Sequence, residues 1–338
     1  MKKRQAKRSY VEESEVDLTC RLGPIALPNP IVTASGTYGY SDEVARLGNP
    51  SKLGAVTAKS LSIYSWEGNP APRVWEATAG MLNSVGLQNP GVEAWLEHDL
   101  PPLLARGARV IVSIWGRSVD DYAKAAAALA PALQQLTALE VNVSCPNLED
   151  RGQMFAAHPE ATAAALGAVR DQLRPVAAHA ASVGGAPPNP RAAFPVFAKL
   201  SPNVADLVAV AAAAVGAGAA GLTLINTVLG LAIDAETRRP RLGAGGGGLS
   251  GPAIKPVALR AVADVARALP GTPIIGTGGV RTGLDAVEML LAGASAVGVG
   301  TATFFDPRAA EHVVEGLARW CAEHGVARSA DLVGGLEW

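Results

Sequence analysis

Residues 139–147 read Leu-Glu-Val-Asn-Val-Ser-Cys-Pro-Asn, a β-branched run that stops at a proline. The run predicts a strand over Leu139–Val143, and because the proline cannot continue a hydrogen-bonded ladder, Cys145 falls where the strand opens into a loop. A thiol there can act as an acid, a base or a nucleophile, and the carboxamides of Asn142 and Asn147 can hold a planar polar ligand. An isolated cysteine is more often a small buried apolar residue, so both interpretations stay open at this point.

Seven further apolar runs of this kind alternate with Ala-rich helical stretches. We predict eight buried parallel strands, over Ile31–Ser35, Ala55–Ser60, Val110–Ile114, Leu139–Val143, Val196–Leu200, Gly221–Asn226, Thr272–Gly276 and Ala296–Gly300. The predicted helices cover Val92–Arg106, Val119–Gln135, Pro159–Ala181, Val204–Val215, Ala253–Ala268, Gly283–Ala292 and Pro307–His324. Alternation of this kind favours right-handed crossovers and predicts an α/β fold, a (β/α)₈ TIM barrel. A doubly wound open sheet is the alternative, but no GxGxxG follows the first strand.

Two connections are long and rich in proline or glycine: residues 61–91 and residues 230–251. Both follow predicted strands, so we expect long loops at the carboxyl ends of the strands, where barrel active sites are assembled. The glycine run at 243–248 is either slack or part of a mobile lid. The barrel is expected to span residues 18–325, between a flexible tail (residues 1–17) and a C-terminal extension (residues 326–338).

The composition excludes several classes of protein. The 338 residues carry a formal net charge of −1, which gives no field to attract nucleic acid or an anionic membrane. The three widely spaced cysteines predict a reducing cytoplasm and no metal site built by this chain alone. The basic start, Met1–Arg8, is followed by acidic residues where a signal peptide needs an apolar stretch. The uncharged Leu207–Ile225 is mostly Ala and Gly, which predicts a helix, a turn and a strand rather than a membrane span.

Polar groups end most of the apolar runs, and on a barrel they converge on one face. A lone lysine at a strand end is usually a surface residue, but Lys59 and Lys199 beside a thiol and several amides suit an anionic, planar ligand. Gly278-Gly279 and Gly300-Thr301 follow the last two strands and offer bare backbone N–H groups, to which Ser250-Gly251 adds another. This pattern predicts a phosphate site, and therefore a phosphorylated cofactor with the substrate stacked beside it.

Together the motifs resemble the class 1 dihydroorotate dehydrogenases, FMN-dependent enzymes of pyrimidine synthesis. The resemblance runs from about Leu18 to about Leu317 and rests on residues 34–37, 59–60, 83–89 and 142–147. Residues 225–234 and 248–256 resemble the B-type, NAD-linked branch, in which a second subunit carries FAD and a [2Fe–2S] cluster. The resemblance implies dihydroorotate as the substrate, FMN as the cofactor, a homodimer, and an electron-transfer subunit that completes a heterotetramer.

The resemblance also implies roles for individual residues. Cys145 would be the base that removes a proton from C5 while a hydride leaves C6 for flavin N5. The substrate would be held by Lys59, Asn83, Ser84, Val85, Gly86, Leu87, Asn142, Asn147, Asn226 and Thr227. The FMN would be lined by Ser35, Lys59, Ser60, Ser113, Asn142, Lys199, Ile225, Gly251, Gly278, Gly279, Gly300 and Thr301. The family usually has asparagine at the position of Ser113, and a serine reaches less far toward the flavin.

Two other functions stay open. A dihydropyrimidine-dehydrogenase-like enzyme also uses a cysteine loop and FMN on a barrel, but its substrates lack the carboxylate that Lys59 would bind. A redox-silent phosphate-binding barrel, such as a lyase or isomerase of a sugar phosphate, would leave Cys145 structural and the protein colourless.

Overall fold

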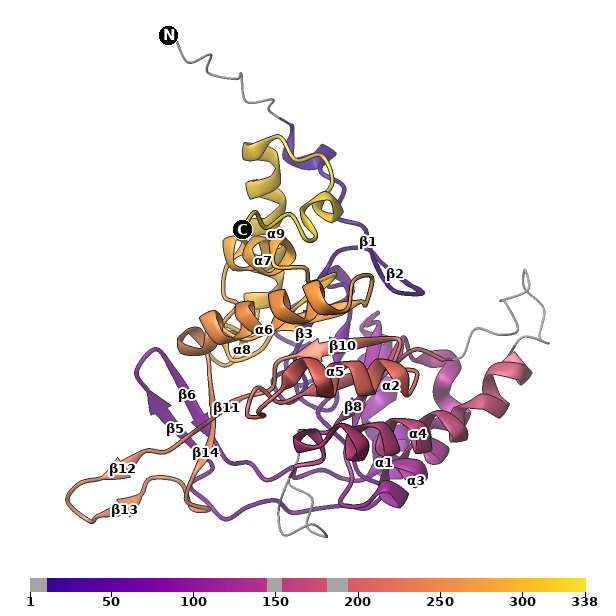
Figure 1. Ribbon diagram of the computed structural model, residues 1–338, viewed down its shortest axis with the longest axis vertical. Helices are drawn as coiled ribbons and strands as arrows, with labels where there is room; N and C mark the ends of the chain where they lie inside the picture. Colours follow the sequence, from indigo (N-terminus) through magenta and orange to yellow (C-terminus); the bar gives the residue numbers. More distant parts are fainter. Residues whose placement is uncertain (1–10, 145–153, 181–193) are drawn as a thin grey trace.

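The computed structural model describes residues 11–144, 154–180 and 194–338. At its centre lie eight parallel strands (Figure 1): β3 (Ile31–Thr33), β4 (Val56–Thr57), β7 (Val110–Ile114), β8 (Ala138–Asn142), β9 (Val196–Leu200), β10 (Gly221–Leu224), β15 (Ile274–Thr277) and β16 (Ala296–Val299). Their hydrogen-bonded order is β3-β16-β15-β10-β9-β8-β7-β4. A parallel bridge between Val32 and Ala55 links the two end strands and closes the sheet. The predicted (β/α)₈ barrel is confirmed, and each predicted strand overlaps one of these eight.

Helices follow the strands and pack around the barrel. Six lie where helices are predicted: α3 (Val119–Leu129), α4 (Pro159–Ala180), α5 (Leu207–Gly216), α6 (Lys255–Ala268), α7 (Gly283–Leu291) and α9 (Ala309–His324), the last preceded by the short α8 (Ala302–Phe305). The seventh, predicted over Val92–Arg106, is divided into α1 (Val92–Ala94), a π-helical stretch (Trp95–Asp99) and α2 (Leu100–Ala105). Pro101 and Pro102 explain the division, because neither has the N–H that an α-helical bond to the preceding turn requires.

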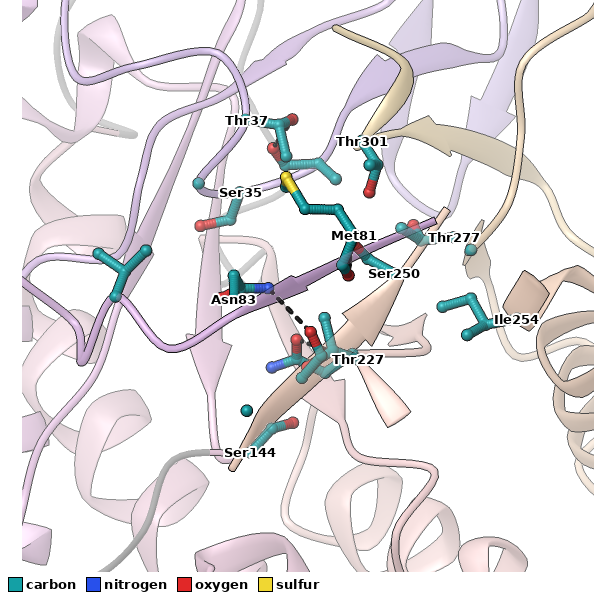
Figure 2. Close-up of a pocket in the computed structure, with 18 of the residues that line it drawn as sticks. Ser35, Thr37, Met81, Asn83, Ser144, Thr227, Ser250, Ile254, Thr277 and Thr301 are labelled. Atoms are coloured by element: carbon teal, nitrogen blue, oxygen red, sulfur yellow. Dashed lines mark hydrogen bonds between the residues drawn. The ribbon is translucent and has the colours of Figure 1, made fainter. Parts of the chain in front are cut away.

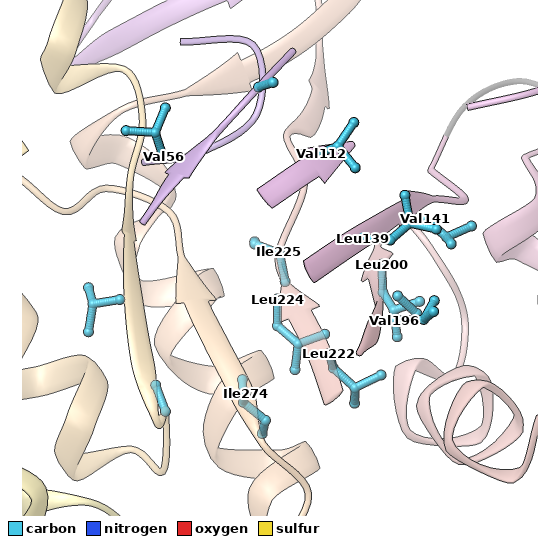
Figure 3. Packing of buried hydrophobic residues seen from close by; sticks show 14 of the residues in the cluster. Val56, Val112, Leu139, Val141, Val196, Leu200, Leu222, Leu224, Ile225 and Ile274 are labelled. Atoms are coloured by element: carbon cyan, nitrogen blue, oxygen red, sulfur yellow. The ribbon is translucent and has the colours of Figure 1, made fainter. Parts of the chain in front are cut away.

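Alternate strand residues face opposite sides of the barrel wall. Residues such as Val112, Val141 and Leu222 belong to the main apolar core, which includes helix residues (Figure 3). Inward-facing residues near the amino ends of the strands, including Ile111 and Phe197, form a separate apolar cluster. Residues of a hairpin, β1 (Cys20–Leu22) and β2 (Ile25–Leu27), join this cluster and close the floor of the barrel.

The inward positions become polar two residues further along the same strands. These side chains are buried, and we call them the polar ring: Thr57, Ser113, Glu140, Lys199, Thr223 and Thr277. The interior of a barrel is usually filled by branched apolar residues. The polar ring therefore marks the end of the barrel at which polar chemistry takes place.

The two long connections form more regular structure than the loops expected from the sequence. Their strands make an antiparallel sheet in the order β11 (Val228–Gly230), β14 (Gly247–Ser250), β6 (Gly80–Asn83) and β5 (Val74–Ala77). A two-stranded hairpin, β12 (Ile233–Asp234) and β13 (Arg239–Pro240), projects beyond this sheet (Figure 1). Glycine permits the close pairing, since a Cβ on Gly247 would lie 2.4 Å from the Asn83 carbonyl oxygen. The glycine run is therefore partly a strand.

The two ends of the described chain lie together. Asp17 forms a parallel bridge with Arg328, and Ser329 N donates to the Asp17 carbonyl at 3.0 Å. Leu332, in a short 3₁₀ helix (Ser329–Leu332), is buried in the main core. In the described ranges, no helix has both the length and the apolar character that crossing a membrane requires.

Candidate functional site

A cavity of about 860 Å³ opens at the carboxyl ends of the barrel strands, where the antiparallel sheet adjoins them (Figure 2). All of the predicted site residues that lie in the described ranges line it, except Ser113. They are Ser35, Lys59, Ser60, Asn83, Ser84, Val85, Gly86, Leu87, Asn142, Lys199, Ile225, Asn226, Thr227, Gly251, Gly278, Gly279, Gly300 and Thr301. Cys145 and Asn147 lie outside the described residues, and Ser144, next to Cys145 in the chain, lines the cavity.

Lys59 is held in the cavity wall by neutral groups. Its Nζ donates to the Gln88 carbonyl oxygen at 2.6 Å and to Gln88 Oε1 at 3.3 Å, and it lies 4.9 Å from the centroid of the Tyr40 ring. Burial lowers the pKa of Lys59 to about 8, and the positive charge of Arg73 adds to the lowering. Among the described residues no carboxylate forms an ion pair with it. An anionic ligand is therefore the partner that this ammonium lacks.

Carboxamides from three elements meet near Lys59. Asn142, at the end of β8, donates through Nδ2 to Ser60 Oγ at 3.2 Å. Asn226 donates to Asn142 Oδ1 at 3.5 Å and accepts from Thr227 N at 2.8 Å. Asn83 reaches in from β6, and its Nδ2 donates to the Gly248 carbonyl at 3.3 Å (Figure 2). A carboxamide has two donor hydrogens and an acceptor oxygen, so these contacts fix each group and leave capacity for a planar ligand.

The opposite part of the cavity is built from backbone. Gly251, Gly278 and Gly279 have φ values of 92°, 135° and 77°, a region that favours glycine. The amides of Gly278, Gly279 and Thr301 donate to no other backbone group within the described part of the chain. Thr277 Oγ1 is also buried there without a hydrogen-bond partner among the described residues. Backbone N–H groups left without a partner in a cavity wall fit a phosphate group.

Ser113 lies one layer behind the cavity, in the polar ring. Its Oγ is 2.9 Å from Ser60 Oγ and donates to Glu140 Oε1 at 3.0 Å. Ser113 is therefore not part of the cavity lining, and its contact with a cofactor stays a prediction. Glu140 was missed by the sequence analysis. Its signal was the alternation Leu139-Glu140-Val141-Asn142-Val143, which puts Glu140 on the same face as Asn142.

Further lining residues were also missed. They come mainly from the two long connections and from the segments that follow strands: Asn69, Met81, Met154, Ile254, Arg281 and Phe304. Met81 projects from β6 into the cavity (Figure 2). Arg281 had a usable signal, because it is a cation four residues after the strand β15 and two residues after Gly279.

Comparisons with known proteins agree on one family. A family model described as dihydroorotate dehydrogenase matches residues 18–320. A protein of Pelobacter propionicus named dihydroorotate dehydrogenase B (NAD(+)), catalytic subunit, is 44% identical over 95% of this chain and 99% of its own length. A protein of the same name from Geobacter sulfurreducens is 43% identical over 95% and 98%. The solved structure of DHODH from Eimeria tenella in complex with ferulenol has the same fold, with a TM-score of 0.75, 22% identity, and coverage of 96% and 90%.

Proposed function

The chain belongs to the dihydroorotate dehydrogenase family, and on that premise we propose that its cavity oxidises (S)-dihydroorotate to orotate with FMN as the resident cofactor. The family resemblance read from the sequence is confirmed. The protein is an oxidoreductase, and its relatives support a role in pyrimidine biosynthesis.

One observation carries the proposal: a single cavity joins a cation and several carboxamides to a cluster of free backbone amides. The first part suits a flat ring of amide groups that bears one carboxylate. The second suits the phosphate of a flavin nucleotide, held by Gly278, Gly279 and Thr301. A sugar-phosphate lyase or isomerase would use the phosphate cluster but has no need for the carboxamides.

The residues of the chain bind and orient the substrate. Lys59 pairs with the carboxylate, and Asn83, Asn142 and Asn226 hydrogen-bond to the edges of the ring. When bound, FMN supplies the acceptor for the hydride that leaves C6. Cys145 takes the proton from C5, so that a proton and a hydride depart and a carbon–carbon double bond forms. Lys199 lines the cavity and would offer positive charge to a bound flavin where reduction adds negative charge.

We infer further that the protein works with a second subunit. Relatives that are 43–44% identical are named as catalytic subunits of NAD(+) enzymes, a name that implies a partner. The described residues contain no cluster of side chains that could hold a metal ion. We therefore propose that an FAD and [2Fe–2S] subunit passes the electrons to NAD⁺, and that two catalytic chains form a dimer within the heterotetramer.

The experiment begins with the colour of the purified protein. We expect a yellow preparation that releases FMN on denaturation and that dihydroorotate bleaches under anaerobic conditions. Cys145→Ala should retain FMN and slow the bleaching by about 10²–10⁴-fold, the usual contribution of a positioned base. Cys20→Ala, at the floor of the barrel, serves as the control and should bleach at the wild-type rate. A colourless protein that cannot bind added FMN would sink the proposal, as would bleaching by dihydrouracil but not by dihydroorotate.

A further inference from the structure

Glu140 is a buried carboxylate in the centre of the barrel, and the reaction described above does not use it. Only 3% of the residue is exposed. A carboxylate removed from water is costly unless charge and hydrogen bonds compensate it. The strand register brings compensating groups close to Glu140. Ser113 on β7 is directly opposite Glu140, and Lys199 on β9 is directly opposite Asn142, two residues further along β8.

Both oxygens of Glu140 are satisfied. Oε1 accepts from Ser113 Oγ at 3.0 Å, and Oε2 accepts from Thr223 Oγ1 at 2.9 Å. The Lys199 ammonium lies 4.0 Å from Oε1, and its side chain is only 6% exposed. Among the described residues, Glu140 is the one carboxylate within ion-pair distance of Lys199. Lys199 lines the cavity, whereas neither Glu140 nor Thr223 does.

A chain of hydroxyl groups also connects Glu140 to the cavity wall. An ionised carboxylate can only accept, so Ser113 must give its hydrogen to Glu140. Ser60, 2.9 Å away, then donates to Ser113, and accepts in turn from Asn142 Nδ2 at 3.2 Å. Two routes therefore lead from one buried charge to cavity-lining groups, one through Lys199 and one through Ser60.

We propose that Glu140 is a positioning residue that holds Lys199 at the base of the cavity and sets the reduction potential of the flavin bound there. The inference rests on the proposed function, because it requires FMN beside Lys199. Reduction adds negative charge to the cofactor, which the Lys199 ammonium favours and the Glu140 carboxylate opposes. The opposing effects of these two charges set the potential, and because both side chains are buried, water does not screen them.

The test is the midpoint potential of the bound flavin, measured by anaerobic titration of purified holoenzyme. Glu140→Gln keeps the size and the hydrogen-bonding oxygen but removes the charge, so the potential should become more positive. We expect a change of about tenfold in the equilibrium constant for reduction, which for a two-electron couple is about 30 mV. Glu311→Gln is the matched control, because Glu311 is a buried glutamate on α9 that pairs with Lys52 and Arg308 instead. The flavin in Glu311→Gln should have the midpoint potential of the wild type.

Thr223→Val gives an independent measurement if Glu140→Gln does not fold. Valine has the shape of threonine but removes the hydroxyl that donates to Oε2, so the carboxylate becomes less screened and the potential should fall. An unchanged potential in folded, flavin-bound Glu140→Gln, or in Thr223→Val where Glu140→Gln is not obtained, would overturn the inference. Failure of the wild type to bind FMN would instead overturn the proposed function, so the two failures are distinguishable.

Discussion

Lys59 makes the binding step sensitive to pH. Burial lowers its pKa from an ordinary value of 10.5 to about 8, so the ammonium is lost within an accessible range. In the proposed binding mode, the carboxylate of orotate pairs with that charge. We expect the affinity for orotate to fall as the pH rises through 8, by up to about tenfold for each further unit. Titration calorimetry between pH 6.5 and 9.5 measures this, in Cys145→Ala protein so that no thiol titrates in the same range.

Controls separate this effect from unfolding. A lysine whose pKa is lower in the folded state binds fewer protons than the unfolded chain between about pH 8 and 10.5. Lys59 therefore makes the folded state more stable as the pH rises through that window, and cannot cause a loss of binding by unfolding. Lys59→Met should bind weakly at every pH, whereas Lys124→Met on the surface should behave as the parent. A flat affinity profile in the parent would contradict the assignment.

At the scale of single residues, the sequence predicts the functional side chains at strand ends better than those inside the strands. Lys59, Asn142 and Lys199 could be found because an apolar run stops at or near each of them. Glu140 could not be paired with Thr223 from sequence, because the register between separate strands is not a local property. The reduced reach of Ser113 was predicted, but its role as a link between Ser60 and Glu140 depends on that same register.

Among the elements, the antiparallel sheet beside the cavity is the part that the sequence concealed. Its central strands β6 and β14 pair across a long separation in sequence, since Asn83 and the Gly248 opposite it are 165 residues apart. Each strand is only three or four residues long, and β11, β6 and β14 contain glycine, so they have neither the length nor the periodicity on which strand prediction rests. Only the contacts between the two connections reveal the pairing.

The close approach of this sheet to Thr227, a proposed substrate-binding residue, makes Gly248 a sensitive position. A Cβ there would lie 2.0 Å from Thr227 Oγ1, too close for either group to keep its place. Gly248→Ala should displace Thr227 at a cost of about 1–3 kcal/mol. We expect the KM for dihydroorotate to rise about tenfold or more while FMN stays bound.

Steady-state kinetics and flavin content measure the two effects. Gly167→Ala on α4 is the matched control, since nothing lies within 4 Å of an added Cβ there. It should leave the KM unchanged and slightly favour the helix. Loss of FMN from Gly248→Ala, with an unchanged KM in the flavin-bound fraction, would place the sheet against the cofactor rather than the substrate.

At the scale of the whole molecule, the fold was the feature that the sequence predicted best. Eight apolar runs alternating with helical stretches leave few topologies, because right-handed crossovers and burial on both faces restrict how parallel strands can be joined. The closed barrel brings the polar strand ends to one mouth, which is why residues from Ser35 to Thr301 line a single cavity. Oligomeric contacts have no such periodic signal, so the proposed partner subunit rests on the family resemblance and on the names of the relatives.

If a second subunit passes the electrons to NAD⁺, the isolated chain should reduce a dye much faster than it reduces NAD⁺. Within the described residues, the cavity has one set of free amides for a nucleotide phosphate. The sequence has three widely spaced cysteines, Cys20, Cys145 and Cys321, in place of a cluster motif. Purified alone, the chain should therefore pass electrons from dihydroorotate to an artificial dye but reduce NAD⁺ at least about a hundredfold more slowly. Absorbance at the dye and NADH bands in parallel assays gives the ratio. Adding the co-purified FAD and iron–sulfur subunit should raise only the NAD⁺ rate, and equal rates from the isolated chain would rule out a required partner.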